Sequence, residues 1–172
     1  MLDRHTIDCP AGTALAGFRI QISDCPDDYI QYAYSCVEDH LQGARSTFLT
    51  ECTDVAGEIL FLDRFADKVR CGSGEVLTGF RFLNSCDTDG GTWEQYEYTC
   101  APTTAFSVDD PQLYGSGCHC IHQIHLSWMD RLDVPVITGR ALRGFSMNAC
   151  SGGNCAGNEG YREYQTLRTR MP

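Results

Sequence analysis

The chain has 172 residues, of which 42% are hydrophobic, and its formal net charge is −10. This acidic balance argues against binding to nucleic acid and to anionic membrane surfaces, which both require basic protein surface. No apolar stretch approaches the roughly 18 residues of a membrane helix, so we expect no membrane insertion. The length and the hydrophobic content favour a single packed domain that spans residues 1–172.

The first strands in chain order are ALAGFRIQI and YIQYAYSC. In the second of these, Tyr32, Tyr34 and Cys36 alternate with small or polar residues, which is typical of a half-buried strand. VLTGFRFLN and WEQYEYTC repeat the pair in the middle of the chain, and ALRGFSM and GYREYQTL repeat it near the end. The loops between them are rich in Gly, Asp, Ser and Pro, and beyond a turn near residues 65–69 we expect little helix.

These strand pairs divide the chain into three copies of one unit, about residues 1–61, 62–128 and 129–172. The copies share an Asp-Arg pair, a Leu and a Gly-Phe pair, found at Asp3, Arg4, Leu15, Gly17 and Phe18, at Asp63, Arg64, Leu77, Gly79 and Phe80, and at Asp130, Arg131, Leu142, Gly144 and Phe145. Three such units around one axis can share a core that a single unit cannot form. We therefore predict an all-β, disulfide-stapled fold with a pseudo-threefold repeat of small antiparallel sheets. A β-prism is favoured, and a β-trefoil is the alternative.

Eleven cysteines are present. Such a density is typical of a disulfide framework made in an oxidising compartment, so we expect a secreted, extracellular protein. The first residues, MLDRHTIDCP, lack the apolar run of a signal peptide. The chain is therefore expected to be a mature or trimmed form.

The copies predict two disulfides, Cys9–Cys36 and Cys71–Cys100, because these cysteines open and close the first two copies. In the third copy we place Val136 at the opening position and Thr166 at the closing position, so both cysteines are absent together. Paired loss indicates pairing, because a lone partner would be a reactive thiol.

A second class of cysteines precedes each aromatic strand. The pairs expected for this class are Cys25 with Cys52, Cys86 with Cys118 or Cys120, and Cys150 with Cys155. One of the two cysteines in CHCIHQIH is then left over, and an odd thiol in an exported protein suggests an interchain bridge or a missing partner.

Two segments carry candidate binding chemistry. In CDTDGGTWEQ, Trp93 is a possible stacking platform for a sugar, and Asp87 and Asp89 are candidate partners for its hydroxyl groups, although an ordinary Asp-Gly turn also explains the segment. CHCIHQIH could hold a soft metal, but its spacing matches no closed four-ligand site, so we expect no metal and no cofactor. No catalytic motif is present, and we expect no enzyme and no catalytic residues.

The phrase CPAGTALAGFRI followed by YAYSC resembles the repeat of the dermatopontin family, which opens with Cys-Pro-x-Gly, passes through an apolar Gly-Phe strand and ends on an aromatic strand closed by Cys. CGSGEVLTGFRF followed by YEYTC is similar. The chain resembles more distantly the vitelline membrane outer layer proteins, which form a threefold β-prism. These resemblances imply an extracellular, disulfide-bonded, non-catalytic protein of matrices or egg coats, sometimes with glycan binding.

Long segments follow the first two copies, and none follows the third. If such a segment supplies a strand, the sheet of the third copy keeps an unpaired edge that a strand from another chain can occupy. We therefore expect a structural subunit that forms a homo-oligomer or polymer of a matrix, coat or filament. The alternative is a lectin-like protein that binds extracellular glycans.

Overall fold

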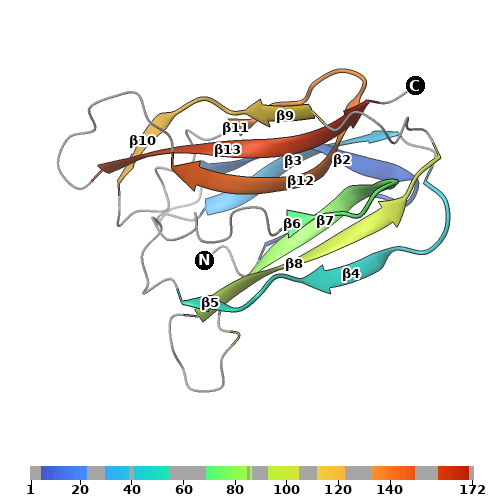
Figure 1. Ribbon diagram of the computed structural model, residues 1–172, viewed down its shortest axis with the longest axis horizontal. Coiled ribbons are helices and arrows are strands. Elements are labelled where there is room, and N and C mark those ends of the chain that lie inside the picture. The colour runs from blue at the N-terminus through green and yellow to red at the C-terminus, as the bar shows by residue number, and fades with distance from the viewer. Residues whose placement is uncertain are drawn as a thin grey trace.

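The computed structural model describes residues 5–22, 30–38, 41–54, 69–84, 86, 93–104, 112–122, 133–149 and 159–170. All regular structure in these residues is β-strand (Figure 1). Three long antiparallel hairpins dominate this described part: β2 (Thr13–Ile22) with β3 (Ile30–Glu38), β7 (Glu75–Asn84) with β8 (Trp93–Pro102), and β12 (Arg140–Ala149) with β13 (Glu159–Arg170). The all-β class expected from the alternating strands is confirmed.

Shorter strands extend the hairpins into three sheets. These strands are β1 (Thr6–Asp8), β4 (Ser46–Leu49), β5 (Thr53–Asp54), β6 (Val69–Arg70), β9 (Gln112–Gly115), β10 (His119–His122) and β11 (Asp133–Val134). The described sheet orders are β11-β2-β3, β1-β7-β8-β4 with β5 also on β8, and β10-β13-β12-β6 with β9 also on β13.

Each sheet combines strands from two copies of the repeat. β1 of the first copy pairs with β7 of the second, β6 of the second pairs with β12 of the third, and β11 of the third pairs with β2 of the first. This cyclic exchange of short strands supports the interpretation of the chain as three copies. The pseudo-threefold axis itself stays a prediction.

The exchange explains why glycine recurs before the phenylalanine in every copy. A Cβ atom built on Gly17, Gly79 or Gly144 would collide with a backbone carbonyl oxygen of the short strand that crosses there. Only glycine allows so close an approach of two backbones. The glycine is therefore required by the neighbouring copy and not by its own turn.

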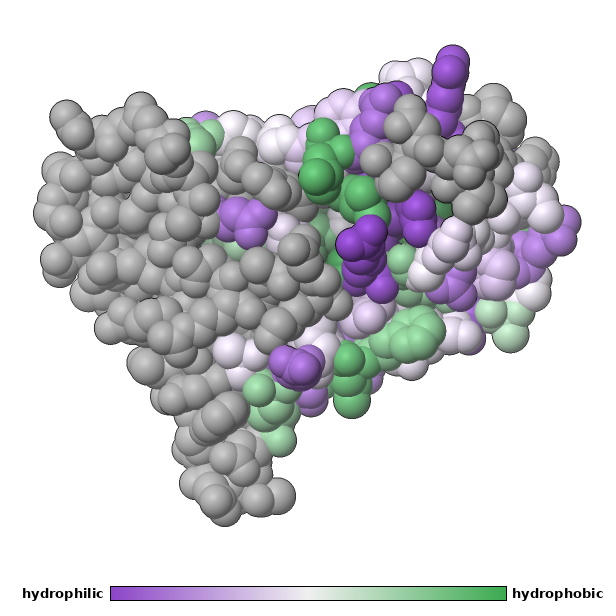
Figure 2. All heavy atoms as spheres, in the orientation of Figure 1, coloured by the Kyte–Doolittle hydropathy of each residue, from purple (hydrophilic) through white to green (hydrophobic). Residues whose placement is uncertain are grey.

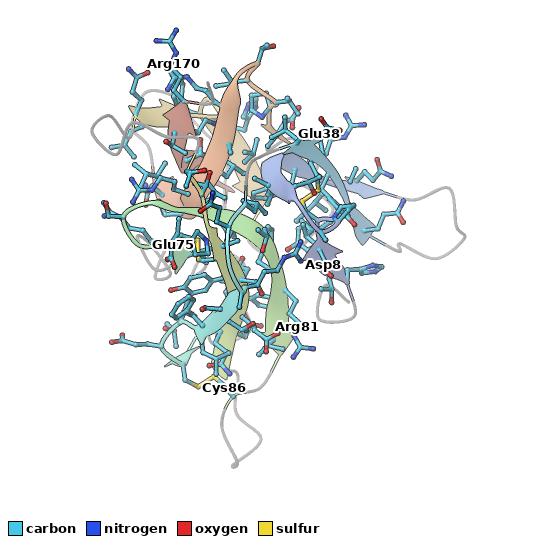
Figure 3. All side chains as sticks on the ribbon, turned by 90° about the vertical axis from the view of Figure 1, so that its right-hand side faces the viewer. Asp8, Glu38, Glu75, Arg81, Cys86 and Arg170 are labelled. Carbon is cyan, nitrogen blue, oxygen red and sulfur yellow. A yellow bond between two sulfur atoms is a disulfide. The ribbon has the colours of Figure 1, made fainter. Side chains whose placement is uncertain are left out.

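The core lies where the three sheets face one another, and Figure 3 shows the hairpins arranged around this common interior. Phe18, Phe80 and Phe145 meet at its centre. The centroids of their rings are 4.9 Å apart for Phe18 and Phe80, 5.0 Å for Phe18 and Phe145, and 4.6 Å for Phe80 and Phe145. One residue from each copy thus contributes to the same aromatic contact.

Two disulfides form as expected, Cys9–Cys36 and Cys71–Cys100. Each joins the residue after a short strand to the closing strand of the same copy. A loop of this length contributes about 3 kcal/mol in the chain-entropy account.

In the third copy the closing position is Arg168, and the expectation of Thr166 is wrong. Arg168 lies opposite Leu142, as Cys36 lies opposite Leu15 and Cys100 opposite Leu77. Thr166 instead lies opposite Phe145. The register of the β12–β13 hairpin, and not the sequence pattern of β13, determines which residue takes the position that Cys36 and Cys100 hold in the other copies.

Arg168 occupies the place of the missing disulfide. It is fully buried, and its guanidinium donates to the carbonyl oxygen of Pro135 at 2.6 Å and to that of Ala16 at 3.0 Å. Its Nε donates to the Thr166 hydroxyl at 3.0 Å. Burial lowers the pKa of Arg168 to about 10, so it stays charged at neutral pH. Hydrogen bonds therefore tie the third copy to the first where a covalent bond closes the other two copies.

The third described disulfide corrects the expected pairing of the second cysteine class. Cys52 is bonded to Cys86, so neither Cys25–Cys52 nor a bond from Cys86 to Cys118 or Cys120 forms. The expectation assumed that the segment after the first copy folds back on that copy. That segment supplies β4 and β5, which pair with β8 of the second copy, and this pairing brings Cys52 to Cys86. Cys25, Cys150 and Cys155 lie outside the described residues, as does the side chain of Cys120.

Candidate functional site: an open sheet edge

Two of the three hairpins carry further strands on their outer edge. β4 and β5 pair with β8, and β9 and β10 pair with β13. The sheet of the first hairpin ends at β3, whose second edge has no strand beside it in the described part of the chain. The expectation that the unpaired edge belongs to the third copy is therefore wrong. The reason is that each outer segment pairs with the hairpin that follows it in the chain.

The covered strand β8 shows how such an edge is occupied. The backbone N–H of Thr50 donates to the carbonyl oxygen of Tyr96 at 2.9 Å, and the Tyr96 N–H donates to the Thr50 hydroxyl at 2.9 Å. The peptide groups of Tyr96 thus face the outer segment. Because peptide directions alternate along a strand, those of Tyr98 and Cys100 face it as well.

Side chains add to this contact. The ring of Phe48 in β4 stacks on Tyr98 with a centroid distance of 5.5 Å, and the hydroxyls of Thr47 and Thr99 lie 3.3 Å apart. Aromatic and hydroxyl pairs across strands are the usual stabilising contacts of a sheet. The outer strand is therefore held by backbone hydrogen bonds, one aromatic pair and one hydroxyl pair.

The shared register transfers this geometry to β3. Tyr34 lies opposite Phe18 as Tyr98 lies opposite Phe80, and Cys36 corresponds in the same way to Cys100. The peptide groups of Tyr34 and Cys36 therefore point away from β2. We call residues 34–38 of β3 the open edge.

Corresponding residues are more exposed in β3 than in β8, because β4 and β5 lie beside β8 only. Tyr34 is 43% exposed, and Cys36 is only partly buried, whereas Cys100 is 0% exposed. The residues are similar in kind, so the difference follows from the strand that covers β8.

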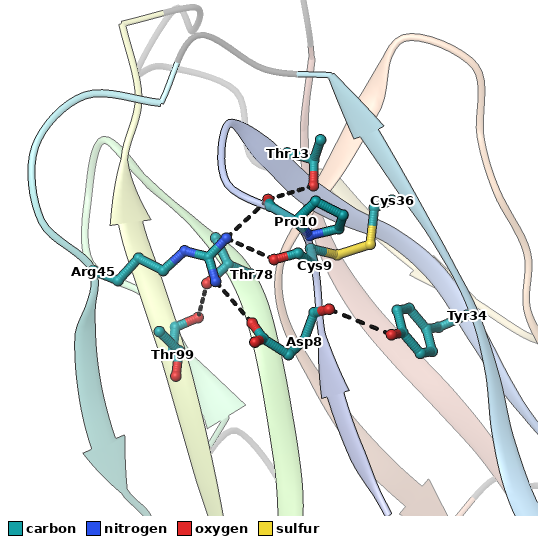
Figure 4. The surroundings of a disulfide bond; sticks show 9 residues. All are labelled: Asp8, Cys9, Pro10, Thr13, Tyr34, Cys36, Arg45, Thr78 and Thr99. Carbon is teal, nitrogen blue, oxygen red and sulfur yellow. Dashed lines mark hydrogen bonds and ion pairs between the residues drawn. A yellow bond between two sulfur atoms is a disulfide. The ribbon is translucent and has the colours of Figure 1, made fainter.

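The open edge is held firmly in place (Figure 4). The Cys9–Cys36 disulfide ties β3 to the residue after β1, and the Tyr34 hydroxyl donates to the carbonyl oxygen of Asp8 at 3.3 Å. Arg45 clamps the same corner. Its guanidinium lies 2.7 Å from the Asp8 carboxylate and donates to the carbonyl oxygens of Cys9 and Pro10 at 2.7 and 2.9 Å. A strand fixed in this way is preorganised for pairing.

The sequence of β3 lacks the usual protections of an exposed edge. Among its nine residues, IQYAYSCVE, Glu38 is the only charged one, and no Lys or Pro is present. Natural edge strands are commonly short or carry charges, prolines or bulges that prevent pairing with other chains. Apart from the charge of Glu38 at its end, β3 has neither Lys nor Pro and is nine residues long.

A polar groove of about 300 Å³ lies beside the open edge, between β11, β2 and β3. Arg19, Tyr34, Ser35 and Asp133 contribute to its lining. The matching groove of the second sheet, about 330 Å³, contains an ion pair in which Arg81 Nε lies 2.8 Å from Glu97 Oε1. In the first sheet Ala33 takes the place of Glu97 opposite the arginine, so Arg19 has no carboxylate across the hairpin.

The glycan site expected from the sequence stays a prediction, because the described structure does not include its side chains. Asp87 and Asp89 lie outside the described residues, and Trp93 is described only by its backbone at the start of β8. The next residue, Glu94, is described. Burial raises the pKa of Glu94 to about 7, so its carboxyl group is only partly ionised at neutral pH.

The segment around Cys118 provides no metal site within the described residues. Cys118 is disulfide-bonded, and no group of three or more described His, Cys, Asp or Glu side chains is placed to hold a metal ion. The described residues also form no helix that is long and apolar enough to cross a membrane.

Sequence reasoning missed the position of the open edge and the role of Arg168. The segment TFLTECTD contains the strand and the cysteine that join the second hairpin, but nothing in its sequence specifies which hairpin it joins. No sequence signal distinguishes Arg168 from Arg170 two residues later, because the burial of Arg168 depends on the register of β13.

No protein-family model, curated protein or solved structure matches this chain. Conclusions about function therefore depend on the geometry of the described residues.

Proposed function

We propose that this protein is a non-enzymatic, extracellular structural subunit that assembles through the open edge of β3. The observation that carries the proposal is a fixed, nine-residue strand without a neighbour on its second edge among the described residues, in a fold whose other two hairpins are covered there. The three described disulfides support assembly outside the cell, because such bonds persist in oxidising surroundings. The resemblance to dermatopontin repeats agrees with a matrix role.

The described exposed surface supports an edge contact better than a broad apolar one. In Figure 2, the described hydrophobic side chains on the visible face are scattered among hydrophilic ones. The large apolar side chains most exposed in the described residues are spread over several elements: Tyr34 on β3, Phe48 and Leu49 on β4, Leu113 on β9, and Val136 after β11. Backbone pairing along a strand needs no such patch.

The test is the mass of the oxidised full chain in solution, measured by sedimentation velocity over a range of concentrations. We expect oligomers for the natural chain and monomers for Tyr34→Pro, because proline removes the N–H group that points to the open edge while an edge strand tolerates it. Tyr34→Thr keeps that N–H group and serves as the matched control. Circular dichroism and a count of free thiols establish that each variant is folded. A natural chain that stays monomeric at all concentrations contradicts the proposal.

A lectin-like function is the second candidate, and the groove beside the open edge favours it. Arg19, Ser35 and Asp133 there offer charged and hydroxyl groups to a polyhydroxylated ligand. Glycan-array binding that is lost in Arg19→Ala would support this candidate. Loss in Trp93→Ala with no effect of Arg19→Ala would place the sugar at CDTDGGTWEQ instead. An array without signal contradicts both sites.

A further inference from the structure

We infer that the strand which covers the open edge is β3 of a second copy, paired antiparallel about a twofold axis at Tyr34. This inference rests on the proposed function and names the partner that the edge accepts. It follows from three properties of β3, namely the direction of its peptide groups, the contacts made on its covered counterpart, and its distribution of charge.

The first property is the direction of the peptide groups. Tyr34 and Cys36 direct their N–H and C=O groups to the open edge, by the register argument from Tyr96. A second β3 strand, rotated about an axis at Tyr34, presents the same groups in the opposite direction. Tyr34 then exchanges two backbone hydrogen bonds with Tyr34 of the other copy, and the two residues form a hydrogen-bonded pair of an antiparallel ladder.

The second property is the type of contact that already covers β8. There an aromatic side chain, Phe48, stands opposite Tyr98 and stacks on it. The position equivalent to Tyr98 is Tyr34. Pairing about Tyr34 places the ring of one copy opposite the ring of the other, so a second copy supplies the aromatic partner that β4 supplies in the second sheet.

The third property is the distribution of charge. Glu38 is the only charged residue of β3, and it lies near one end. In the twofold arrangement Glu38 lies opposite Ile30 of the other copy, so no like charges face each other. A register shifted by two residues would bring Tyr34 opposite Cys36 or opposite Tyr32, and would leave residues at the ends of β3 without a position to pair with. The register centred on Tyr34 aligns the two strands over their full length and places equal tyrosines opposite each other.

The whole-molecule charge predicts how this contact responds to salt. Each copy carries a net charge of −10, so two copies repel each other over a distance that salt shortens. The dimer is therefore expected to become tighter when sodium chloride is raised from low to physiological concentration. A contact made by ion pairs would become weaker in the same experiment.

A charge-exchange experiment tests the twofold register. Lysine at position 34 faces lysine in the dimer, so Tyr34→Lys is expected to raise the dimer dissociation constant by about tenfold or more, and Tyr34→Glu should do the same. An equimolar mixture of the two variants places Lys opposite Glu and should recover dimers that contain one copy of each. Leu113→Lys, at an exposed position of β9, is the matched control and should dimerise like the natural chain.

The outcomes separate this inference from the proposed function. If Tyr34→Lys prevents association but the mixture does not restore it, the edge is used for assembly and its occupant is not β3. If Tyr34→Lys associates like the natural chain, both the inference and the proposed function are wrong. Native mass spectrometry of the mixture, with one variant isotopically labelled, distinguishes mixed dimers from dimers of a single variant.

Discussion

The hairpins β2–β3 and β7–β8 are built alike and end differently. Both have ten residues in the first strand, an irregularity just before the glycine, and a disulfide that joins the closing strand to a residue beyond a short strand. β8 is covered by β4 and β5, whereas β3 is open in the described structure. The comparison shows that the exposure of a strand depends on the segment beside it, even where its own residues are nearly the same.

The largest expected effect concerns a feature that the two hairpins share. Gly17→Val and Gly79→Val should each destabilise the fold by about 3 kcal/mol or more, because the new side chain meets a carbonyl oxygen of the crossing strand. Urea denaturation measures the loss. Gly12→Ala is the control, since its added methyl meets no atom within 4 Å and only the positive φ of 80° opposes it, at about 1 kcal/mol. A tolerated Gly17→Val would mean that β11 does not cross β2 as described.

The next effect concerns the copy that lacks the shared disulfide. Arg168→Met should cost about 2–3 kcal/mol, because the buried carbonyl group of Ala16 and the partly buried one of Pro135 lose their hydrogen-bond donors. The double variant Val136→Cys with Arg168→Cys places cysteines at the positions held by Cys9 and Cys36 in the first copy. We expect it to form a fourth bond of this kind and to recover part of the lost stability. Peptide mapping without reduction would reveal a double variant that keeps two free thiols, which would contradict the equivalence of these positions.

A smaller effect is expected from Glu94, which belongs to the covered hairpin. Its pKa is raised to about 7 in the folded chain, against a usual value of 4.5, so the folded state binds the proton more tightly. The stability linked to this proton is complete below pH 4.5 and is lost as pH rises through 7. Relative to Glu94→Gln, the natural chain should lose on the order of 1–2 kcal/mol across this interval, a reduced figure because the side chain is partly solvated. Equal pH profiles of unfolding for the two chains would contradict the shifted pKa.

The smallest expected effect on stability concerns the ion pair that crosses the second hairpin and has no counterpart across the first. Arg81 and Glu97 are partly exposed, so their pair should contribute less than about 1 kcal/mol. Ala33→Glu would give Arg19 a carboxylate across the hairpin, in addition to Asp133, which lies opposite Arg19 on β11, and should stabilise the first hairpin by a similar amount or less. A double-mutant cycle of Ala33→Glu with Arg19→Gln measures the coupling. A coupling energy of zero would show that the two grooves are not equivalent.

The comparison also explains which features could be predicted from the sequence. The alternation of Tyr32, Tyr34 and Cys36 predicted a strand because burial on one face imposes a period of two. The joint absence of cysteines in the third copy predicted Cys9–Cys36 and Cys71–Cys100. Both are properties of a single copy, and local patterns report them.

Properties that involve two copies could not be predicted in this way. Cys52 bonds to Cys86 because an outer segment pairs with the following hairpin, and no local pattern specifies that choice. The same choice determines which hairpin keeps an open edge. Arg168 was missed because a charged residue in a strand is expected at the surface, and only the register of β13 brings it to the buried carbonyl group of Ala16.

The cyclic exchange of short strands has a consequence for how the chain folds. β1 and β6 find their partners in the next copy, but β11 must return to β2 at the other end of the sequence. Contacts between such distant residues carry a large loop-closure entropy and slow the search for the native state. Docking β11 on β2 should therefore be the last step of folding and limit its rate. A fragment of one or two copies would leave at least one crossing unmade, so the three copies are expected to gain and lose structure together.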